Sequence, residues 1–315
     1  STSGMSFWHG LLAVVALTAC LLSALPALTQ AQEKAQGKAL AQENTQLTSV
    51  WEVSSAEHQL FLGGTIHLLR AADFPLPEQF EIAYEAADKI YFETDINAMN
   101  DLGFQAQMLQ TLTYQDERTL QSVLNEEAYL ALNQYAAKSG LPLAMMQKFK
   151  PGLLIATLSV LEVQKLGFTP EGVDMHFASR VAADGKPMGE LESLDTQLSY
   201  LAAMGEGNES EFVLVSLADF EQTAEMMEQM VTAWRAGDDE ALSRYFVNDL
   251  KSRSPEVYQS LLVDRNENWR HLIEAMLETP ERELVLVGAA HLLGDDGLLA
   301  MLSAGGYEVR QLPLP

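Results

Sequence analysis

Cysteine is almost absent from this 315-residue chain, since Cys20 is the only one. It lies in an apolar N-terminal stretch, so the rest of the chain has no disulfide, no thiol nucleophile and no cysteine ligand for a metal. The folded part must therefore be held together by its core alone. This is more typical of an extracytoplasmic bacterial protein than of a small secreted scaffold.

Basic residues are also scarce, with 19 Lys and Arg against 44 Asp and Glu, for a formal net charge of −25. Such a surface repels phosphate backbones and anionic headgroups, which argues against nucleic acid as a partner. The apolar content of 48% and charged content of 20% are globular values. The composition therefore indicates a folded, acidic domain.

Three common catalytic motifs are missing. The sequence has no Gly-x-Ser-x-Gly elbow, no His-Glu-x-x-His helix and no phosphate-binding loop. Readings as a serine hydrolase, a zincin or a nucleotide-binding protein are poorly supported as a result.

No charged residue precedes Glu33, and an apolar run extends over residues 11–28. We interpret residues 1–32 as a signal peptide or membrane anchor. Residues 17–20 (LTAC) resemble a lipobox, so cleavage, retention and lipidation at Cys20 all stay open. Each outcome predicts an extracytoplasmic protein, periplasmic or membrane-anchored, with N-terminal membrane contact possible.

Residues 33–47 are rich in Gln, Ala, Lys and Glu and read as a polar linker, and residues 48–315 form the domain. Apolar patterns predict strands at both ends of the domain and mostly helices between them. The predicted strands are residues 49–54, 59–65, 89–94, 185–190, 283–287 and 307–311. The sequence thus predicts a mixed α/β fold, with a central sheet built from N- and C-terminal strand regions and a large helical insert.

Two segments of the chain share a pattern. Residues 60–67 (LFLGGTIH) and 284–291 (LVLVGAAH) are each an apolar strand followed by Gly-x-x-His. Ligands of open α/β sheets bind outside the carboxyl ends of the strands, so His67 and His291 are expected to face one cleft. Imidazole suits a divalent metal and general-base catalysis, although each histidine could simply cap its strand by hydrogen bonding.

Acidic residues occur at comparable positions. Glu93 ends one predicted strand, and Glu190 and Glu192 end another. Carboxylates with histidines form ligand sets for zinc, manganese or iron, and a remaining carboxylate can activate water. The alternative is that each acid is a solvated strand end or a helix cap. Asp174 and His176 lie at a helix start, where Asp174 is either part of the site or a favourable charge near the helix dipole.

Arg265 and Asn266 belong to a helix predicted to begin near Asp264. Arg265 is one of few cations in a very acidic domain, and it is expected to point into the cleft. There it would clamp a substrate carboxylate or stabilise developing charge. The alternative is an ordinary ion pair with a nearby acid.

Five blocks resemble, in order, the TraB/GumN family. They are LFLGGTIHLL, LPEQFEIAYEAADKIYFETD, GVDMHFASRVAADGKPMGELESLDTQLSYL, DRNENW and LVLVGAAHLLGDDGLLAMLSAGGYEV. The resemblance covers nearly all of the chain after residue 48. The same superfamily includes the Tiki proteins, which are regarded as membrane-anchored proteases that use divalent ions. Their motif residues match His67, His291, Glu93 and Glu192, and the family's Arg-Asn pair matches Arg265 and Asn266.

The resemblance implies an exported metal-dependent hydrolase with peptidase-like activity. His67, His291, Glu93 and Glu192 would hold a divalent metal (Mn, Co or Zn). Glu93, Glu192 and Arg265 would take part in catalysis, and Arg265 and Asn266 would bind a peptide or another small extracytoplasmic substrate. The alternative function is a non-catalytic extracytoplasmic protein that binds a peptide or saccharide. A metal-free hydrolase acting through His and Glu is a third possibility.

Overall fold

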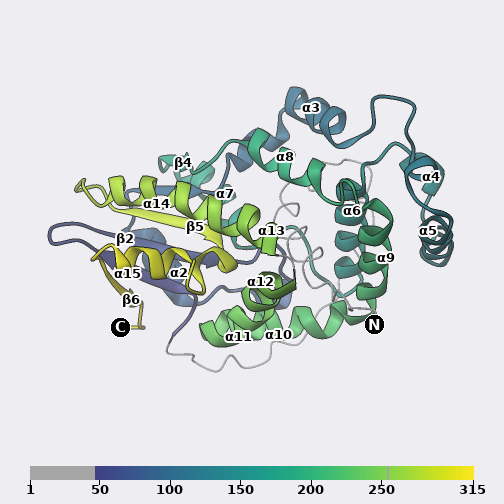
Figure 1. Cartoon of the computed structure of the whole chain (residues 1–315). Helices are drawn as coiled ribbons and strands as arrows, with labels where there is room; N and C mark the ends of the chain where they lie inside the picture. The colour runs from purple at the N-terminus through teal and green to yellow at the C-terminus, as the bar shows by residue number, and fades with distance from the viewer. Residues whose placement is uncertain (1–46, 254) are drawn as a thin grey trace.

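A six-stranded mixed sheet and the helices that flank it form one half of the molecule, and further helices form the other (Figure 1). The computed structural model describes residues 47–253 and 255–315. The predicted signal segment and nearly all of the predicted linker lie outside these residues. The strands are β1 (Val50–Ser54), β2 (Gln59–Thr65), β3 (Lys89–Phe92), β4 (Met188–Glu190), β5 (Glu283–Gly288) and β6 (Glu308–Gln311).

The strand order is β4-β3-β5-β2-β1-β6, and the first four strands in this order are parallel neighbours. β1 pairs antiparallel with β2 and with β6. The carboxyl ends of the four parallel strands therefore share one edge of the sheet. In Figure 1 this edge faces the helical half of the molecule.

Most of the helices come from the middle of the chain, between β3 and β5. The α-helices are α2 (Glu78–Ala86), α3 (Leu102–Leu112), α4 (Leu120–Val123), α5 (Glu126–Ser139), α6 (Pro151–Gln164), α7 (Val173–Asp184), α8 (Leu194–Ala203), α9 (Glu209–Asp219), α10 (Thr223–Ala236), α11 (Asp239–Ser243), α12 (Asp249–Arg253), α13 (Pro255–Tyr258), α14 (Asp264–Met276) and α15 (Leu298–Ala304). The predicted mixed α/β fold, with a helical insert between terminal strand regions, is confirmed.

The core runs from the sheet into the helical half. All six residues of β5 are buried, as expected for a central strand covered on both faces. The methionines of α10 that the sequence assigned to the core, Met226, Met227 and Met230, are each at most 2% exposed. On the same helix, the Trp234 indole N–H donates to the Gly64 carbonyl at 2.7 Å, which ties the helical half to β2.

Two local features differ from the sequence prediction. The strand expected over residues 185–190 begins only at Met188, because Gly185 still belongs to the end of α7 and adopts a left-handed conformation with φ 68°. A π-helical turn, Gln259–Val263, directly precedes α14. Such turns alter the direction of side chains within a helix and are frequent at functional sites.

Within the described part of the chain, none of the helices has the length and apolar character needed to cross a membrane.

Candidate functional site

Four neighbouring parallel strands are each followed by one candidate residue, at the edge of the sheet where their carboxyl ends lie. His67 follows β2, His291 follows β5, Glu93 follows β3, and Glu192 follows β4. Thr65 and Gly288 are register partners in the parallel pair of β2 and β5, so the two Gly-x-x-His motifs lie side by side. The edge that the sequence indicated therefore gathers all four residues.

His67 is buried and held by an acid from α7. Its Nδ1 lies 2.8 Å from Asp174 Oδ2, and the Thr65 hydroxyl donates to the other carboxylate oxygen at 3.0 Å. A carboxylate only accepts hydrogen bonds, so Nδ1 carries the proton and Nε2 of a neutral ring carries the lone pair. Asp174, which the sequence left undecided between site and helix start, thus positions His67.

His291 is held in the same way by Asn266. Its Nδ1 lies 2.7 Å from Asn266 Oδ1, while Asn266 Nδ2 donates to the Asp296 carbonyl at 2.9 Å. That second bond fixes which amide atom is the oxygen, so His291 donates through Nδ1 and Nε2 is left to accept. Burial, and then the positive charge of Arg265, lower the pKa of His291 well below its usual value. His291 is therefore a neutral imidazole.

Gly288 marks the point at which the candidate ligands converge. A Cβ atom placed on Gly288 would lie within 4 Å of Glu93 Oε1, His67 Nε2 and His291 Cδ2. Because all three atoms lie within 4 Å of one point, any two of them are at most 8 Å apart. Glu93 Oε1 also accepts the Gly288 N–H at 2.8 Å and lies 3.9 Å from His291 Nε2. The convergence expected for the two histidines and one carboxylate is present.

Arg265 points into this site, as the sequence predicted, and it is 3% exposed. Its Nη2 donates to Glu93 Oε2 at 3.1 Å, and its Nε lies 3.1 and 3.2 Å from the two oxygens of Glu192. Its Nη1 lies 3.2 Å from the Leu261 carbonyl, which belongs to the π-helical turn. The guanidinium therefore pairs with protein groups on all sides and links both acids.

Two aromatic rings flank the guanidinium of Arg265. Its Cζ lies 4.7 Å from the ring centroid of Trp269 and 5.5 Å from that of Tyr200. Trp269 also packs on the imidazole of His291, with ring centroids 4.4 Å apart. These contacts fix the arginine through cation–π attraction and restrict the motion of the histidine.

Glu93 is a buried acid of the site. Burial raises the pKa of its carboxyl above the usual value, and the charge of Arg265, together with that of His67 when its ring is protonated, opposes this shift. Charged Glu93 thus lies in a setting that favours an additional positive charge nearby.

Gln197, on α8, was missed by the sequence analysis. Its amide donates to Glu93 Oε2 at 3.1 Å and to Glu192 Oε1 at 3.2 Å. A glutamine within an ordinary helical pattern carries no sign of such a role, because only the fold brings it opposite Glu93. Two other candidates do not join the site: Glu190 is exposed, and His176 packs against Phe74 and Phe177.

The described part of the chain contains no group of three or more His, Cys, Asp or Glu side chains arranged to hold a metal ion. Arg265 Nη1 lies 3.3 Å from His291 Nε2, on the lone-pair side of this ring. The donor set nevertheless fits a divalent cation in its chemistry. Each imidazole is anchored at Nδ1 by an oxygen acceptor, which is the usual support of histidines that ligate metals through Nε2.

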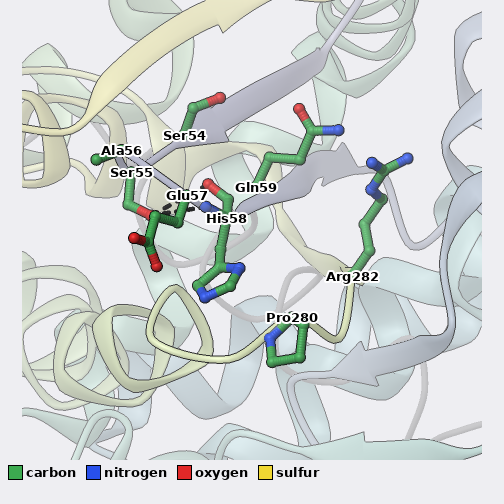
Figure 2. Close-up of a pocket in the computed structure, with 8 residues that line it drawn as sticks. All are labelled: Ser54, Ser55, Ala56, Glu57, His58, Gln59, Pro280 and Arg282. Carbon is green, nitrogen blue, oxygen red and sulfur yellow. Dashed lines mark hydrogen bonds between the residues drawn. The ribbon is translucent and has the colours of Figure 1, made fainter.

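A separate pocket of about 380 Å³ lies at the opposite end of the strands (Figure 2). It is formed by the turn between β1 and β2, including His58 and Glu57, and by Pro280 and Arg282 from the segment before β5. The turn and this segment precede β2 and β5, whereas His67 and His291 follow them. This pocket is therefore not part of the histidine site.

Residues 49–311 match the model of the TraB/PrgY/gumN family. The chain belongs to this family. No curated protein and no solved structure matches the sequence at a significant level. The family match spans all strands of the sheet and all the candidate residues, in agreement with the resemblance seen in the sequence.

Proposed function

We propose that this TraB/PrgY/gumN protein is a metal-dependent hydrolase that cleaves a peptide or related amide bond. We also propose that residues 1–32 direct it out of the cytoplasm. One observation carries the proposed activity. Two buried imidazoles, both anchored at Nδ1 by oxygen acceptors, converge with Glu93 Oε1 beside Gly288.

The charges in the site support a divalent ion. Glu93 and Glu192 both pair with Arg265, Asp174 pairs with His67, and both candidate histidine ligands present a lone pair when neutral. With the three acids ionised and both imidazoles neutral, three negative charges and the one positive charge of Arg265 leave a formal charge of −2 in a buried region. Buried charge is costly unless it is paired, so a divalent cation would stabilise this arrangement.

His67, His291 and Glu93 would hold the ion, and the family resemblance together with the histidine and carboxylate ligands would suit manganese, cobalt or zinc. A divalent ion in such a site supplies a Lewis acid that polarises a carbonyl and makes water a stronger nucleophile at neutral pH. Glu192 is the remaining carboxylate, and we assign to it the acceptance of the proton from the attacking water. Arg265 keeps Glu192 in place through two parallel hydrogen bonds and would limit the build-up of negative charge.

The second candidate function is non-catalytic binding of a peptide or saccharide. This alternative is supported by Arg265, because its N–H donors already bond to Glu93, Glu192 and the Leu261 carbonyl and are not left free for a reacting group. A network satisfied in this way can be purely structural, and a metal-free hydrolase would also keep it. Cation binding and turnover separate these alternatives.

The decisive experiment uses Gly288→Ala. A methyl group at Gly288 would project among the three candidate ligand atoms, 3.3 Å from Glu93 Oε1 and 3.6 Å from His67 Nε2. The backbone of Gly288, with φ −49° and ψ 134°, suits alanine, so the fold should persist. Gly305→Ala is the matched control, because its Cβ would lie at least 3.3 Å from its neighbours at the end of α15.

We expect the purified wild-type protein and Gly305→Ala to bind Mn²⁺ in calorimetry and to cleave members of a peptide library in a chelator-sensitive way. Gly288→Ala should lose both properties while it stays folded by circular dichroism. Mn²⁺, Co²⁺ and Zn²⁺ binding by Gly288→Ala with wild-type affinity would refute the assignment. Cation binding without any turnover would favour the binding protein.

A further inference from the structure

Gln197 occupies a central position between the two acids of the site. It lies in the first turns of α8, which begins two residues after Glu192, and it is 3% exposed. Its amide nitrogen lies 3.1 Å from Glu93 Oε2 and 3.2 Å from Glu192 Oε1. A carboxamide nitrogen carries two N–H groups, so it can satisfy one oxygen of each acid at the same time.

These bonds make the two oxygens of Glu93 different from each other. Oε2 accepts from Gln197 and from Arg265, both at 3.1 Å. Oε1 accepts from the Gly288 N–H and is the oxygen that lies 3.9 Å from His291 Nε2. The carboxylate is therefore prevented from rotating about its terminal bond, and only Oε1 faces the histidines.

A neutral donor has an electrostatic advantage at this position. A second arginine or a lysine would also hold the two carboxylates, but it would cancel the negative charge that attracts a cation. A glutamine orients both acids and leaves the charge of the site unchanged. Gln197 therefore orients both acids while the site keeps its net negative charge.

We infer that Gln197 is a positioning residue that keeps Glu93 as a one-oxygen ligand, with Oε1 toward the cation and Oε2 turned away. This inference rests on the proposed function, because it assigns the cation to His67, His291 and Glu93. Gln197 itself does not touch the cation. Its contribution is the orientation of Glu93 and the spacing between Glu93 and Glu192.

The test is a Co²⁺ titration followed by visible absorption, which reports ligand number and geometry independently of any turnover. Gln197→Met keeps a similar volume and removes both N–H donors. Gln107→Met is the matched control, because Gln107 donates to Asp195 in the first turn of the same α8 at 2.7 Å, outside the site. Gln197→Leu also removes both N–H donors without adding charge, and it serves if the methionine variant does not fold.

We expect Gln197→Met to bind Co²⁺ about tenfold to a hundredfold more weakly, as is typical when a partner of a ligand is removed. At saturation its absorption bands should shift and weaken, because a freed Glu93 can bind through both oxygens. Gln107→Met should match the wild type in affinity and spectrum. The same affinity and spectrum for Gln197→Met and the wild type would overturn this inference alone. A wild-type protein that binds no Co²⁺ would overturn the metal assignment, and this inference with it.

Discussion

Asp174 Oδ2 lies 2.8 Å from His67 Nδ1, and this contact sets which nitrogen of the ring faces the site. Asp174 comes from the first turn of α7, and its other oxygen accepts from Thr65, the last residue of β2. The acid therefore joins a helix to the strand that carries His67. A carboxylate behind a histidine also raises the basicity of the far nitrogen, which strengthens that nitrogen as a ligand.

Asp174→Asn should weaken cation binding while the protein stays folded. The amide is neutral and can present either its oxygen or its nitrogen to His67, so the ring loses its charged partner and its fixed tautomer. We expect the Kd for Mn²⁺ to rise by about tenfold to a hundredfold in calorimetry. Asp101→Asn is the control, since asparagine can also cap α3 through the Phe104 N–H. An unchanged Kd in Asp174→Asn would show that the contact does not support a ligand.

Gly172→Ala should disturb His67 from the backbone side. A Cβ at Gly172 would lie only 2.3 Å from the carbonyl carbon of His67 and from the Ile66 oxygen, so the start of α7 or the end of β2 must move. Overpacking of this kind costs about 1–3 kcal/mol, to be measured by urea unfolding. Co²⁺ affinity should fall as well. A variant with wild-type stability would mean that these two segments separate easily.

Arg265→Lys should lower both stability and activity. The guanidinium is buried between Glu93 and Glu192, and an ammonium cannot reproduce its parallel bonds to Glu192. Loss of a partner from a buried pair costs about 3–5 kcal/mol, and lysine should recover only part of this. Arg270→Lys, on the same helix, is the control, because partly exposed pairs with Glu267 and Glu274 contribute about 0–1 kcal/mol. Equal urea midpoints for the two variants would contradict the buried role of Arg265.

The three strands β2, β3 and β5 could be predicted from the sequence because each contains an apolar run that leads into glycine or an acidic residue. The same runs predicted which edge of the sheet carries His67 and His291, since parallel strands place their carboxyl ends together. The sequence did not reveal the pairing order that sets Glu93 between the strands of His291 and Glu192. Pairing order depends on packing between segments that are distant in the chain.

The supporting residues of the site were harder to predict than its histidines. Asp174 and Asn266 were noticed, but their function depends on distances of 2.8 and 2.7 Å to histidine nitrogens that only the fold creates. Gln197 was not noticed at all, because one polar residue in a helix is unremarkable in a sequence. The burial of Arg265 also changes its interpretation, from a substrate clamp to a group whose donors are directed at Glu93 and Glu192.

Glu283 should make the stability of this protein depend on pH. It is 3% exposed at the start of β5, and in the described residues its Oε2 has no hydrogen-bond partner. Burial raises the pKa of its carboxyl from 4.5 to about 7. Between these values the folded state binds more protons than the unfolded state, so the free energy of unfolding falls as the pH rises through this window.

Glu283→Gln removes that titration and should be more stable than the wild type at pH 8, with a smaller gain at pH 4. Urea unfolding from pH 4 to pH 8 measures the difference, and Glu281→Gln, an exposed neighbour, is the control. A gain for Glu283→Gln that does not grow with pH would show that the Glu283 carboxyl titrates alike in the folded and unfolded chain.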